Sequence, residues 1–511
     1  MISPDEAIIS IVLRHTRSLE GLNKEARMKD YYMDHAATTP LSKEALEAMM
    51  PYLTTEYGNA STVYTYGQRA KAAIERSRRA IAATIGAKPS EIYFTSGGTE
   101  SDNWALISTC EAGREHLSKT LQPQDTAAAV DQEYRCSSKA SMKCGHIITD
   151  QIEHHAILNT CAYLEKRGFD VTYLPVDHEG HVDPDAVMAA IRPDTLLVSI
   201  MVANNEIGTL EPIVEIGARL QKHAAETGQR ILFHTDAVQA YAHIPLDVDE
   251  LKVDLMSASS HKLSGPKGVG FLYVRRGVKL PSFLHGGEQE RGHRAGTENV
   301  AGIVGFARAA ELACGANPQP MSSRSSTDTA ATSTAGARAA ELACGVNPQL
   351  MSSSSSTDTV ATSTASAHAA ASSIDCMAQR IAQESAVRDH LIKRLLDEIP
   401  YTSLNGDPTH RLPNNVNVCF KYIEGETLLL LLSEKHIYAS AGSACASGSL
   451  EPSHVLTAIG IPHEDAYGSL RLTIGPETTL EDVDEVVDLM KPIIAHLRET
   501  SPQYRNRFIT S

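Results

Sequence analysis

The sequence predicts an α/β protein, with a large domain built on a mostly parallel central sheet and a smaller α+β domain at its C-terminal end. Three observations predict this fold class. Short apolar runs alternate with helical patterns from about residue 31 to 300, a Ser/Thr/Ala-rich repeat follows, and helix and strand patterns resume after residue 373. The chain has 511 residues, which is too long for one ordinary core, so at least two domains are expected.

Residues 1–30 are expected to form an N-terminal extension. Leu13–Arg17 resembles part of a transit peptide, whereas four acidic side chains between residues 5 and 25 argue against one. The extension is therefore interpreted as a dispensable tail, or as the result of where translation was taken to begin. We expect a cytoplasmic protein, with a mitochondrion or related organelle as the alternative location.

Residues 31–306 are predicted to form the large domain. Short apolar runs beside turn or helix signals predict strands over residues 91–95, 145–149, 195–201, 230–234 and 269–274. Alternation of such strands with helices favours a parallel sheet, and ligand chemistry then lies on the loops that follow the strands. The polar segment 111–143 is predicted to be a surface insertion in this domain.

A tandem repeat lies in the middle of the chain. Residues 307–336 recur as residues 337–366, with 25 of 30 positions identical. A period of this length can indicate a solenoid, but two copies with few large apolar residues are too few to share a core. Residues 307–373 are therefore predicted to be a low-complexity insertion that is disordered from about Asn317 to Ser373.

Residues 374–511 are predicted to form the smaller domain. Apolar spacing predicts a strand over residues 416–420 and helices over residues 378–399, 424–432, 451–459 and 480–498.

Composition excludes several classes of function. A formal net charge of -16 argues against general binding to nucleic acid or to an anionic membrane. No apolar run approaches the roughly 18 residues that a membrane span needs. Nine cysteines without a C-x-x-C pair indicate reduced thiols rather than a disulfide framework or a zinc site.

A lysine motif gives the first indication of chemistry. Lys262 follows small hydroxyl residues and a histidine and precedes Gly265-Pro266. This setting suits a lysine that forms a Schiff base with an aldehyde cofactor. Ser259 and His261 are then candidates to hold a phosphate of that cofactor. The motif alone is equally well explained by a solvated loop lysine.

Three further segments favour a cofactor site. Gly98 and Thr99 lie in a glycine turn between a predicted strand and helix, where backbone N–H groups bind phosphate. Asp236 ends another strand, and a carboxylate facing a pyridine nitrogen keeps that ring protonated and able to accept electrons. Gln239 is a candidate to hydrogen-bond the ring oxygen. His154 follows a third strand and is a candidate to stack on the ring and move protons.

A loop of small residues, Ala439–Ser449, carries Cys445. An exposed thiol on such a loop suits a nucleophile that must travel, whereas a structural cysteine sits among large apolar residues. The other eight cysteines lack this setting. Arg471, in Gly468–Thr473, is a candidate to bind a substrate carboxylate bidentately.

Taken together, these segments resemble the cysteine desulfurases of the NifS/IscS type, which are class V aminotransferases. Stretches that match the family, in family order, are residues 34–40, 57–59, 95–103, 204–208, 260–262, 294–299, 411–417 and 442–453. The resemblance implies the aminotransferase fold (fold type I) and pyridoxal 5′-phosphate as the cofactor.

The resemblance also implies residue roles. Lys262 would carry the cofactor, and the residues that would hold it are Gly98, Thr99, His154, Asn205, Asp236, Gln239, Ser259, Ser260 and His261. Asn205 would also contact the substrate, together with Arg471. Thr297 would reach the phosphate bound to a partner subunit, which implies a homodimer.

The implied reaction converts L-cysteine to L-alanine and leaves a persulfide on Cys445. Lys262 or His154 would move the Cα proton. The sulfur would pass to an iron–sulfur scaffold or another acceptor protein, and Cys445 would be a transient cluster ligand shared with that scaffold. A selenocysteine lyase or an aminotransferase is the alternative, although transamination needs no thiol. A non-catalytic scaffold is disfavoured because both the lysine and the cysteine are present.

Overall fold

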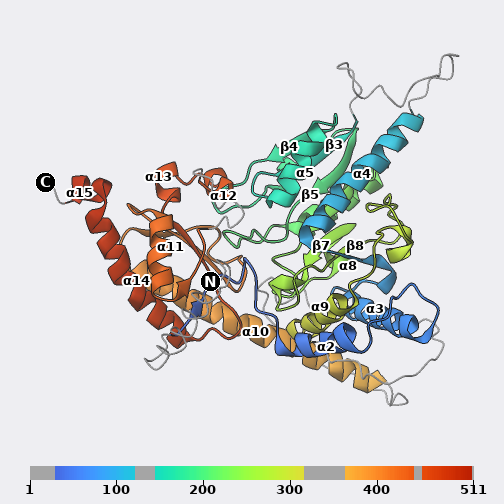
Figure 1. Ribbon diagram of the computed structural model, residues 1–511. Helices are drawn as coiled ribbons and strands as arrows, with labels where there is room; N and C mark the ends of the chain where they lie inside the picture. Colours follow the sequence, from blue (N-terminus) through green and yellow to red (C-terminus); the bar gives the residue numbers. More distant parts are fainter. Residues whose placement is uncertain (1–28, 121–143, 316–362, 442–451, 509–511) are drawn as a thin grey trace, which may run out of the picture.

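The computed structural model describes residues 29–120, 144–315, 363–441 and 452–508. Two domains lie side by side: a large one built on a central sheet, and a smaller one that carries the C-terminal helices, drawn in orange and red in Figure 1. Each domain has its own apolar core.

The central sheet of the large domain has seven strands in the order β2-β8-β7-β6-β5-β3-β4. These strands are β2 (Ile92–Thr95), β3 (His146–Asp150), β4 (Asp170–Leu174), β5 (Thr195–Ser199), β6 (Leu232–Asp236), β7 (Leu255–Ser259) and β8 (Gly270–Val274). Strand β8 is antiparallel to both of its neighbours, and the other pairs are parallel. The prediction of a mostly parallel sheet is therefore confirmed. The five predicted strands correspond to β2, β3, β5, β6 and β8, with no end shifted by more than two residues.

Helices cover both faces of this sheet because successive strand side chains point to opposite sides. Along β5, Leu197 belongs to the apolar cluster beneath α4 (Gly98–Thr120) and α5 (His155–Glu165). Its neighbour Val198 belongs to the cluster on the other face. That second cluster includes residues of α3 (Thr65–Ala83), α7 (Ile213–Thr227) and α9 (Val300–Ala313). The domain is thus a three-layer α/β/α structure (Figure 1).

Shorter helices complete the large domain. They are α2 (Lys43–Thr54), α6 (Pro184–Ala189) and α8 (Val248–Leu251), with 3-10 turns η1 (Pro89–Glu91), η3 (Ser260–Lys262) and η4 (Gln289–Gly292). Among the helices of the described residues, none combines the length and the apolar character needed to cross a membrane.

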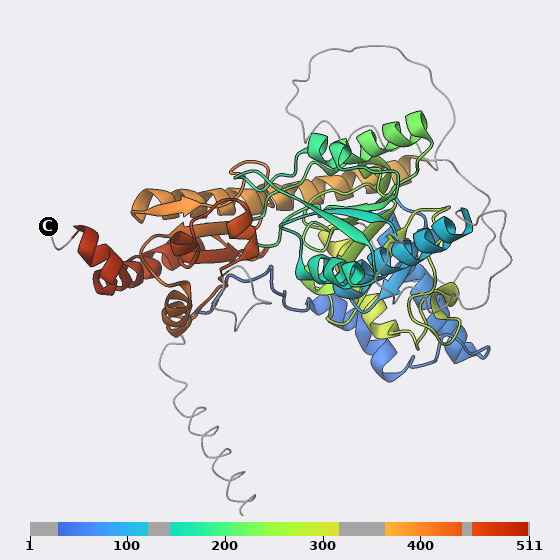
Figure 2. The ribbon, with the colours of Figure 1, turned by 90° about the horizontal axis from the view of Figure 1, so that it is seen from above.

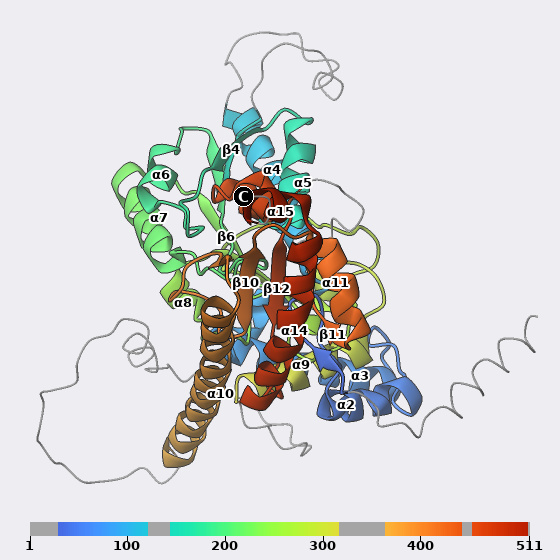
Figure 3. The same cartoon turned by 90° about the vertical axis from the view of Figure 1, so that its left-hand side faces the viewer.

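The small domain has an antiparallel sheet in the order β12-β10-β9. Figure 3 shows β10 and β12 side by side. Its elements are β9 (Thr402–Leu404), β10 (Asn415–Phe420), β12 (Ser469–Thr473), α10 (Ser363–Glu398), α11 (Gly425–Glu434), α12 (His454–Ala458), α13 (His463–Ala466), α14 (Leu480–Thr500) and α15 (Pro502–Phe508). Residues of β10, β12, α10, α11 and α14 share one apolar core. The predicted strand 416–420 and the four predicted helices are all present.

The first described residues belong to the small domain, which corrects the predicted domain boundary. Strand β1 (Tyr31–Tyr32) pairs in parallel with β11 (Ile437–Tyr438). Tyr31 and Met33 are buried in the small-domain core. The prediction placed everything from residue 31 in the large domain, because the sequence does not indicate which distant strand a two-residue strand will join.

The predicted disordered insertion is also corrected at both ends. Helix α9 continues into the first repeat copy, where Ala307 and Ala310 are buried in the large-domain core. Helix α10 begins at Ser363, so residues 363–373 are helical rather than disordered. Residues 316–362 lie outside the described residues. In the same way, α4 extends to Thr120, so the predicted insertion 111–143 begins within a helix, and its remainder also lies outside the described residues.

Helix α10 joins the two domains. Arg380 donates from Nη2 to the carbonyl of Ala313 at the end of α9, at 3.2 Å. Two to four turns later, Val387, Leu391 and Leu395 are buried in the small-domain core. The 36-residue helix therefore contacts both domains along its length, as Figure 2 shows.

Candidate active site

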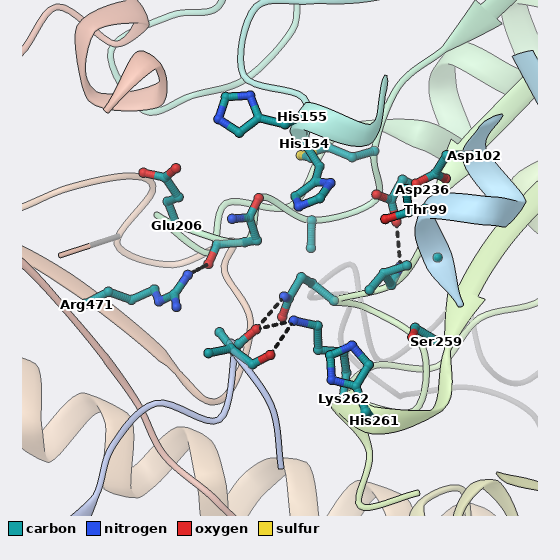
Figure 4. Close-up of a pocket in the computed structure, with 18 of the residues that line it drawn as sticks. Thr99, Asp102, His154, His155, Glu206, Asp236, Ser259, His261, Lys262 and Arg471 are labelled. Atoms are coloured by element: carbon teal, nitrogen blue, oxygen red, sulfur yellow. Dashed lines mark hydrogen bonds between the residues drawn. The ribbon is translucent and has the colours of Figure 1, made fainter. Parts of the chain in front are cut away.

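A cavity of about 280 Å³ lies at the carboxyl ends of the parallel strands and is lined by both domains. The predicted site residues among its lining are Gly98, Thr99, His154, Asn205, Asp236, Gln239, Ser259, His261, Lys262 and Arg471. They come from loops after five different strands and, for Arg471, from the small domain (Figure 4). This is where a parallel sheet is expected to bind its ligand.

Lys262 stands at the end of η3, immediately after β7. Its Nζ donates to the carbonyls of Ala36 at 2.5 Å and Ala37 at 2.9 Å. The turn is held from the same side, because Thr39 Oγ1 donates to the His261 carbonyl at 2.8 Å. The motif at residues 34–40, to which the sequence assigned no role, therefore fixes the direction of the lysine side chain into the cavity.

Asp236 is a buried carboxylate at the end of β6. Its Oδ1 accepts the Val238 N–H at 2.8 Å. Burial raises the pKa of Asp236 to about 6, against the opposing effects of the Val238 N–H and the Lys262 ammonium. A cation placed beside this carboxylate would favour its ionised form. Asp236 therefore suits a partner that carries positive charge.

Asp102 lies next to Asp236 and was missed from the sequence (Figure 4). Burial, followed by repulsion from Asp236, raises the pKa of Asp102 well above its usual value. It comes from the second turn of α4, where its motif position gave no sign that it faces another acid. The floor of the cavity is thus a pair of carboxyl groups, and burial with mutual repulsion disfavours the ionisation of both at once.

His154 caps the N-terminus of α5 and points into the cavity (Figure 4). Its Nδ1 accepts the Ala156 N–H at 3.1 Å. Burial, and then the nearby Lys262 charge, lowers the pKa of His154 to about 4, so the ring is neutral at pH 7. A neutral imidazole has one acceptor and one donor nitrogen. Because Nδ1 accepts, Nε2 carries the proton, and His154 presents a donor rather than a base.

The glycine turn before α4 fits an anionic group. Gly97 has a φ of +154°, and a Cβ on Gly98 would lie 2.5 Å from Val238 Cγ2. The 23-residue helix α4 starts at Gly98, so its positive end faces the cavity beside Thr99 and Ser259. A side chain on Gly98 would therefore clash with Val238, and the backbone N–H groups and hydroxyls at this turn suit a phosphate.

Arg471 lies in the centre of β12 and is 2% exposed. Its Nη1 donates to the Asn205 carbonyl and its Nη2 to Asp34 Oδ1, both at 2.9 Å. Asp34 was not assigned from the sequence, although it opens the 34–40 motif. Both terminal nitrogens of Arg471 thus already donate a hydrogen bond within the protein. A substrate carboxylate in the predicted bidentate contact would share them with Asn205 and Asp34.

Three further residues at the cavity were missed, namely His155, Glu206 and His454. The rings of His155 and His454 lie 4.8 Å apart between centroids. Burial lowers the pKa of both rings. Glu206 accepts a hydrogen bond from Ser453 Oγ. His155 and Glu206 each directly follow a predicted site residue, so extending the predicted loops by one position would have found them.

The structure does not bring every predicted residue to the cavity. Ser260 is fully buried, and its Oγ accepts or donates no hydrogen bond among the described residues. A Cβ on Gly265 would lie 2.1 Å from that oxygen, which shows that the Ser260 side chain packs under the turn. The Ser260 side chain therefore does not reach the cavity, and the role of this residue in holding the cofactor stays a prediction. Thr297 is exposed and does not line the cavity, and Cys445 lies outside the described residues.

Comparison with known proteins identifies the family. The sequence profile of the aminotransferase class-V family matches residues 31–140, 135–335 and 347–486. Cysteine desulfurase IscS of Methanosarcina thermophila is 47% identical over 483 residues, which cover 94% of this chain and 96% of the relative. The chain belongs to the class-V aminotransferases of the NifS/IscS cysteine desulfurase type. IscS of Dictyoglomus turgidum is 44% identical to this enzyme over 474 residues, covering 93% of this chain and 97% of the relative.

Solved structures agree with this assignment. A NifS-like protein superposes with a TM-score of 0.69 at 31% identity, covering 92% of this chain and all of the other. A structure described as SspA in complex with cysteine gives a TM-score of 0.62 at 31% identity, covering 88% of this chain and all of the other. The predicted fold type and family are therefore confirmed.

Class-V aminotransferases and cysteine desulfurases use pyridoxal phosphate. The cavity fits this group on its own evidence. Lys262 offers an amine inside the cavity, and Asp236 is a buried acid suited to a cationic ring nitrogen. The helix α4 N-terminus with Gly98 suits the phosphate.

Proposed function

We propose that this enzyme removes sulfur from L-cysteine, releases L-alanine and carries the sulfur as a persulfide on Cys445. The observation that carries the proposal is a single cavity that combines Lys262, Asp236 and Arg471 in a chain of the NifS/IscS type. Lysine and carboxylate suit the cofactor, and the arginine suits the substrate.

The cofactor would be held at its two ends. Lys262 would bind its aldehyde carbon, Asp236 its ring nitrogen, and Thr99 with Ser259 its phosphate. When bound, pyridoxal phosphate withdraws electrons from the substrate Cα and so weakens the bonds at that carbon. His154 lies where it can cover the ring, and Gln239 already donates from Nε2 to the Ala36 carbonyl at 3.0 Å.

The chain's own groups would orient the substrate and move its proton. Arg471 would bind the carboxylate while Asp34 and the Asn205 carbonyl keep the guanidinium in place. The Lys262 amine is the better base for the Cα proton. His154 already has its proton on Nε2 and accepts at Nδ1 from Ala156, so it would act as a donor instead.

Sulfur transfer would be a nucleophilic displacement. The Cys445 thiolate would attack the substrate sulfur, so that a new S–S bond forms while the substrate C–S bond breaks. The electron pair of that bond stays with the carbon skeleton, which takes up a proton and leaves as alanine. Support comes from the position of the two flanks of the Cys445 segment, since Ser440 pairs with Arg471 and Ser453 bonds Glu206.

The sulfur acceptor and the assembly are further parts of the proposal. An iron–sulfur scaffold or another acceptor protein would take the sulfur, with Cys445 as a transient cluster ligand, and the enzyme would work in the cytoplasm. A homodimer is supported by exposed apolar residues on and after α2, where Leu53, Tyr57 and Val63 are 57%, 72% and 87% exposed. Exposed large apolar side chains are found at protein interfaces, and Thr297 is exposed as a contact to a second subunit requires.

The nucleophile can be tested directly. Purified enzyme given cysteine is expected to release alanine, and sulfide in the presence of a reductant. Cys445→Ser should keep the visible absorption of the bound cofactor and lose sulfide release by a factor of about 10³ or more, because a serine hydroxyl does not attack sulfur in this way. Cys376→Ser is the matched control, since Cys376 is an exposed thiol on α10. Full sulfide release by Cys445→Ser would refute the assignment.

A further inference from the structure

Both flanks of the Cys445 segment are anchored beside the substrate arginine. On the N-terminal flank, Ser440 and Arg471 exchange backbone hydrogen bonds of 3.2 and 2.7 Å. Ser469 Oγ also donates to the Ala441 carbonyl at 3.2 Å. The last described residues before Cys445 are therefore fixed to β12, within the small domain.

The C-terminal flank is anchored to the other domain. Ser453 lies eight residues after Cys445 and caps α12, where its Oγ accepts the N–H groups of Val455 at 3.1 Å and Leu456 at 3.3 Å. The hydroxyl has one proton, and it donates that proton to Glu206 Oε2. Glu206 is in the loop between β5 and α7, so this bond joins the segment to the large domain.

Glu206 is itself held rigidly. Its backbone N–H donates to Asn204 Oδ1 at 2.8 Å, and its carbonyl accepts from Asn417 Nδ2 at 3.0 Å and Asn415 Nδ2 at 3.3 Å. The side chain is 2% exposed. A buried acceptor on a fixed backbone defines one position for the hydroxyl of Ser453.

The same loop also defines the substrate site. Residue 205 lies directly before Glu206, and its carbonyl accepts from Arg471 Nη1 at 2.9 Å. Residues 205 and 206 therefore hold the substrate arginine and the C-terminal flank of the nucleophile segment from adjacent positions of one loop. Arg471, which would bind the substrate carboxylate, and Ser453, which anchors the Cys445 segment, are therefore held by two neighbouring residues of the same loop.

We propose that Glu206 is a positioning residue for sulfur transfer, acting through Ser453 to register the Cys445 segment against the bound cysteine. The proposal rests on Cys445 being the nucleophile. Loss of the Glu206–Ser453 bond then affects the transfer of sulfur more than the binding of cofactor and cysteine, because the groups assigned to hold these two are Lys262, Asp236 and Arg471.

The test separates binding from transfer. We compare the wild-type holoenzyme with three variants, Glu206→Ala, Glu206→Gln and Ser453→Ala. The absorption spectrum reports the bound cofactor, and its change on titration with cysteine gives the Kd for cysteine. Mass spectrometry gives the single-turnover rate of persulfide formation on Cys445. Glu206→Ala and Ser453→Ala should keep the spectrum and a Kd within about twofold, while persulfide forms roughly 10- to 100-fold more slowly. The double variant should be no slower than either single variant, because both remove the same bond.

Glu206→Gln is the conservative variant, because its amide oxygen can accept the Ser453 proton without a charge. It should retain the transfer rate within about threefold. His181→Ala is the matched control, because it removes another cross-domain contact, from His181 Nε2 to Asp407 Oδ2 at 2.9 Å, that does not involve Ser453. It should leave the persulfide rate unchanged.

Three results would overturn the proposal. The first is persulfide formation at the wild-type rate in Glu206→Ala. The second is a persulfide rate in Glu206→Gln as low as in Glu206→Ala. The third is a persulfide rate in His181→Ala that falls as much as in Glu206→Ala. Failure of the proposed function looks different, because sulfide release by Cys445→Ser at the wild-type rate would remove the nucleophile itself. Normal persulfide formation in Glu206→Ala alongside an inactive Cys445→Ser would reject only the positioning role.

Discussion

The carboxyl groups of the cavity are unusual for their burial. Asp102, Asp236 and Glu206 are each no more than 6% exposed, and burial raises the pKa of all three. Burying a carboxylate is costly unless a cation or hydrogen-bond donor compensates. For Asp236 the compensation would come from the cofactor, so the apoenzyme holds an acid whose ionisation is unfavourable until the cofactor binds.

This predicts an unusual effect for Asp236→Asn. The folded pKa of about 6 lies above the unfolded value of roughly 3.9, so the native state binds more protons between these values and stability falls as the pH rises through 6. The apo variant should therefore be more stable than the wild-type apoenzyme at pH 8, on the order of 2 kcal/mol by urea unfolding, and about equal at pH 4. Its affinity for pyridoxal phosphate should fall about tenfold or more. An apo variant less stable than the wild type at pH 8 would contradict this reading.

Sequence could predict most of the cavity because the carboxyl ends of parallel strands meet at one edge. Gly98, His154, Asp236 and Lys262 all lie at or after the ends of strands and all line the cavity. The sequence does not show in which direction each side chain of a turn points. Ser260 therefore appeared as good a ligand as its neighbours, although its side chain packs under the turn. Asp34 could not be assigned because its partner Arg471 lies 437 residues away.

At the scale of elements, the prediction of strands worked where apolar residues alternate or run together. Strand β7 was missed although all five of its residues are buried. Its sequence contains Ser257, whose Oγ lies 3.0 Å from His234 Nε2, so a buried polar pair replaces an apolar one. Strand β4 was missed for the opposite reason, because four of its five residues are only partly buried.

The junction of α9 and α10 predicts that the repeat is dispensable for the fold. The first described buried residue of α10 is Met377, and Arg380 then bonds the carbonyl of Ala313 at the end of α9. Deletion of residues 317–373 should therefore leave the melting temperature within about 2 °C and the cysteine-dependent release of alanine within about twofold. Thermal unfolding of the holoenzyme measures the first, and an alanine assay the second.

A second deletion tests whether tolerance of chain loss is specific to the repeat. Removal of residues 377–384, where Met377 is buried and Arg380 bonds the Ala313 carbonyl of the large domain, should prevent stable folding. A repeat deletion as damaging as this one would show that residues 317–373 carry contacts that the fold needs.

At the scale of the whole molecule, Asp407 of the small domain links the two domains. Its Oδ2 accepts from His181 of the large domain at 2.9 Å, and its Oδ1 accepts the N–H groups of Thr409 and His410 at 2.6 and 2.9 Å. Burial opposes ionisation, but these hydrogen bonds outweigh it and hold the pKa of Asp407 below its usual value. A depressed folded pKa gives stability above the unfolded value of roughly 3.9 that is lost as the pH falls below it.

Asp407→Asn is therefore expected to lower the melting temperature by a few degrees, roughly 1–4 °C, at pH 7, with a difference that narrows as the pH falls from 4 to 2. Calorimetry over this pH range measures the effect. Asp185→Asn is the control, because the Asp185 side chain is 80% exposed and pairs with Arg219 on the surface. An Asp407→Asn difference that stays constant with pH would show that the carboxylate charge is not the cause.

The pairing of β1 with β11 determines the order in which the two domains can finish folding during synthesis. Tyr31 leaves the ribosome early, but its partner Ile437 is made 406 residues later, after the whole large domain. The nascent chain therefore carries an unpaired strand and the exposed side chain of Met33 through most of translation. The large-domain sheet can close first, because all seven of its strands lie between residues 92 and 274. The small domain, and with it the arginine side of the cavity, closes only near the end of synthesis, so a truncated chain could fold its cofactor cradle and still lack a substrate site.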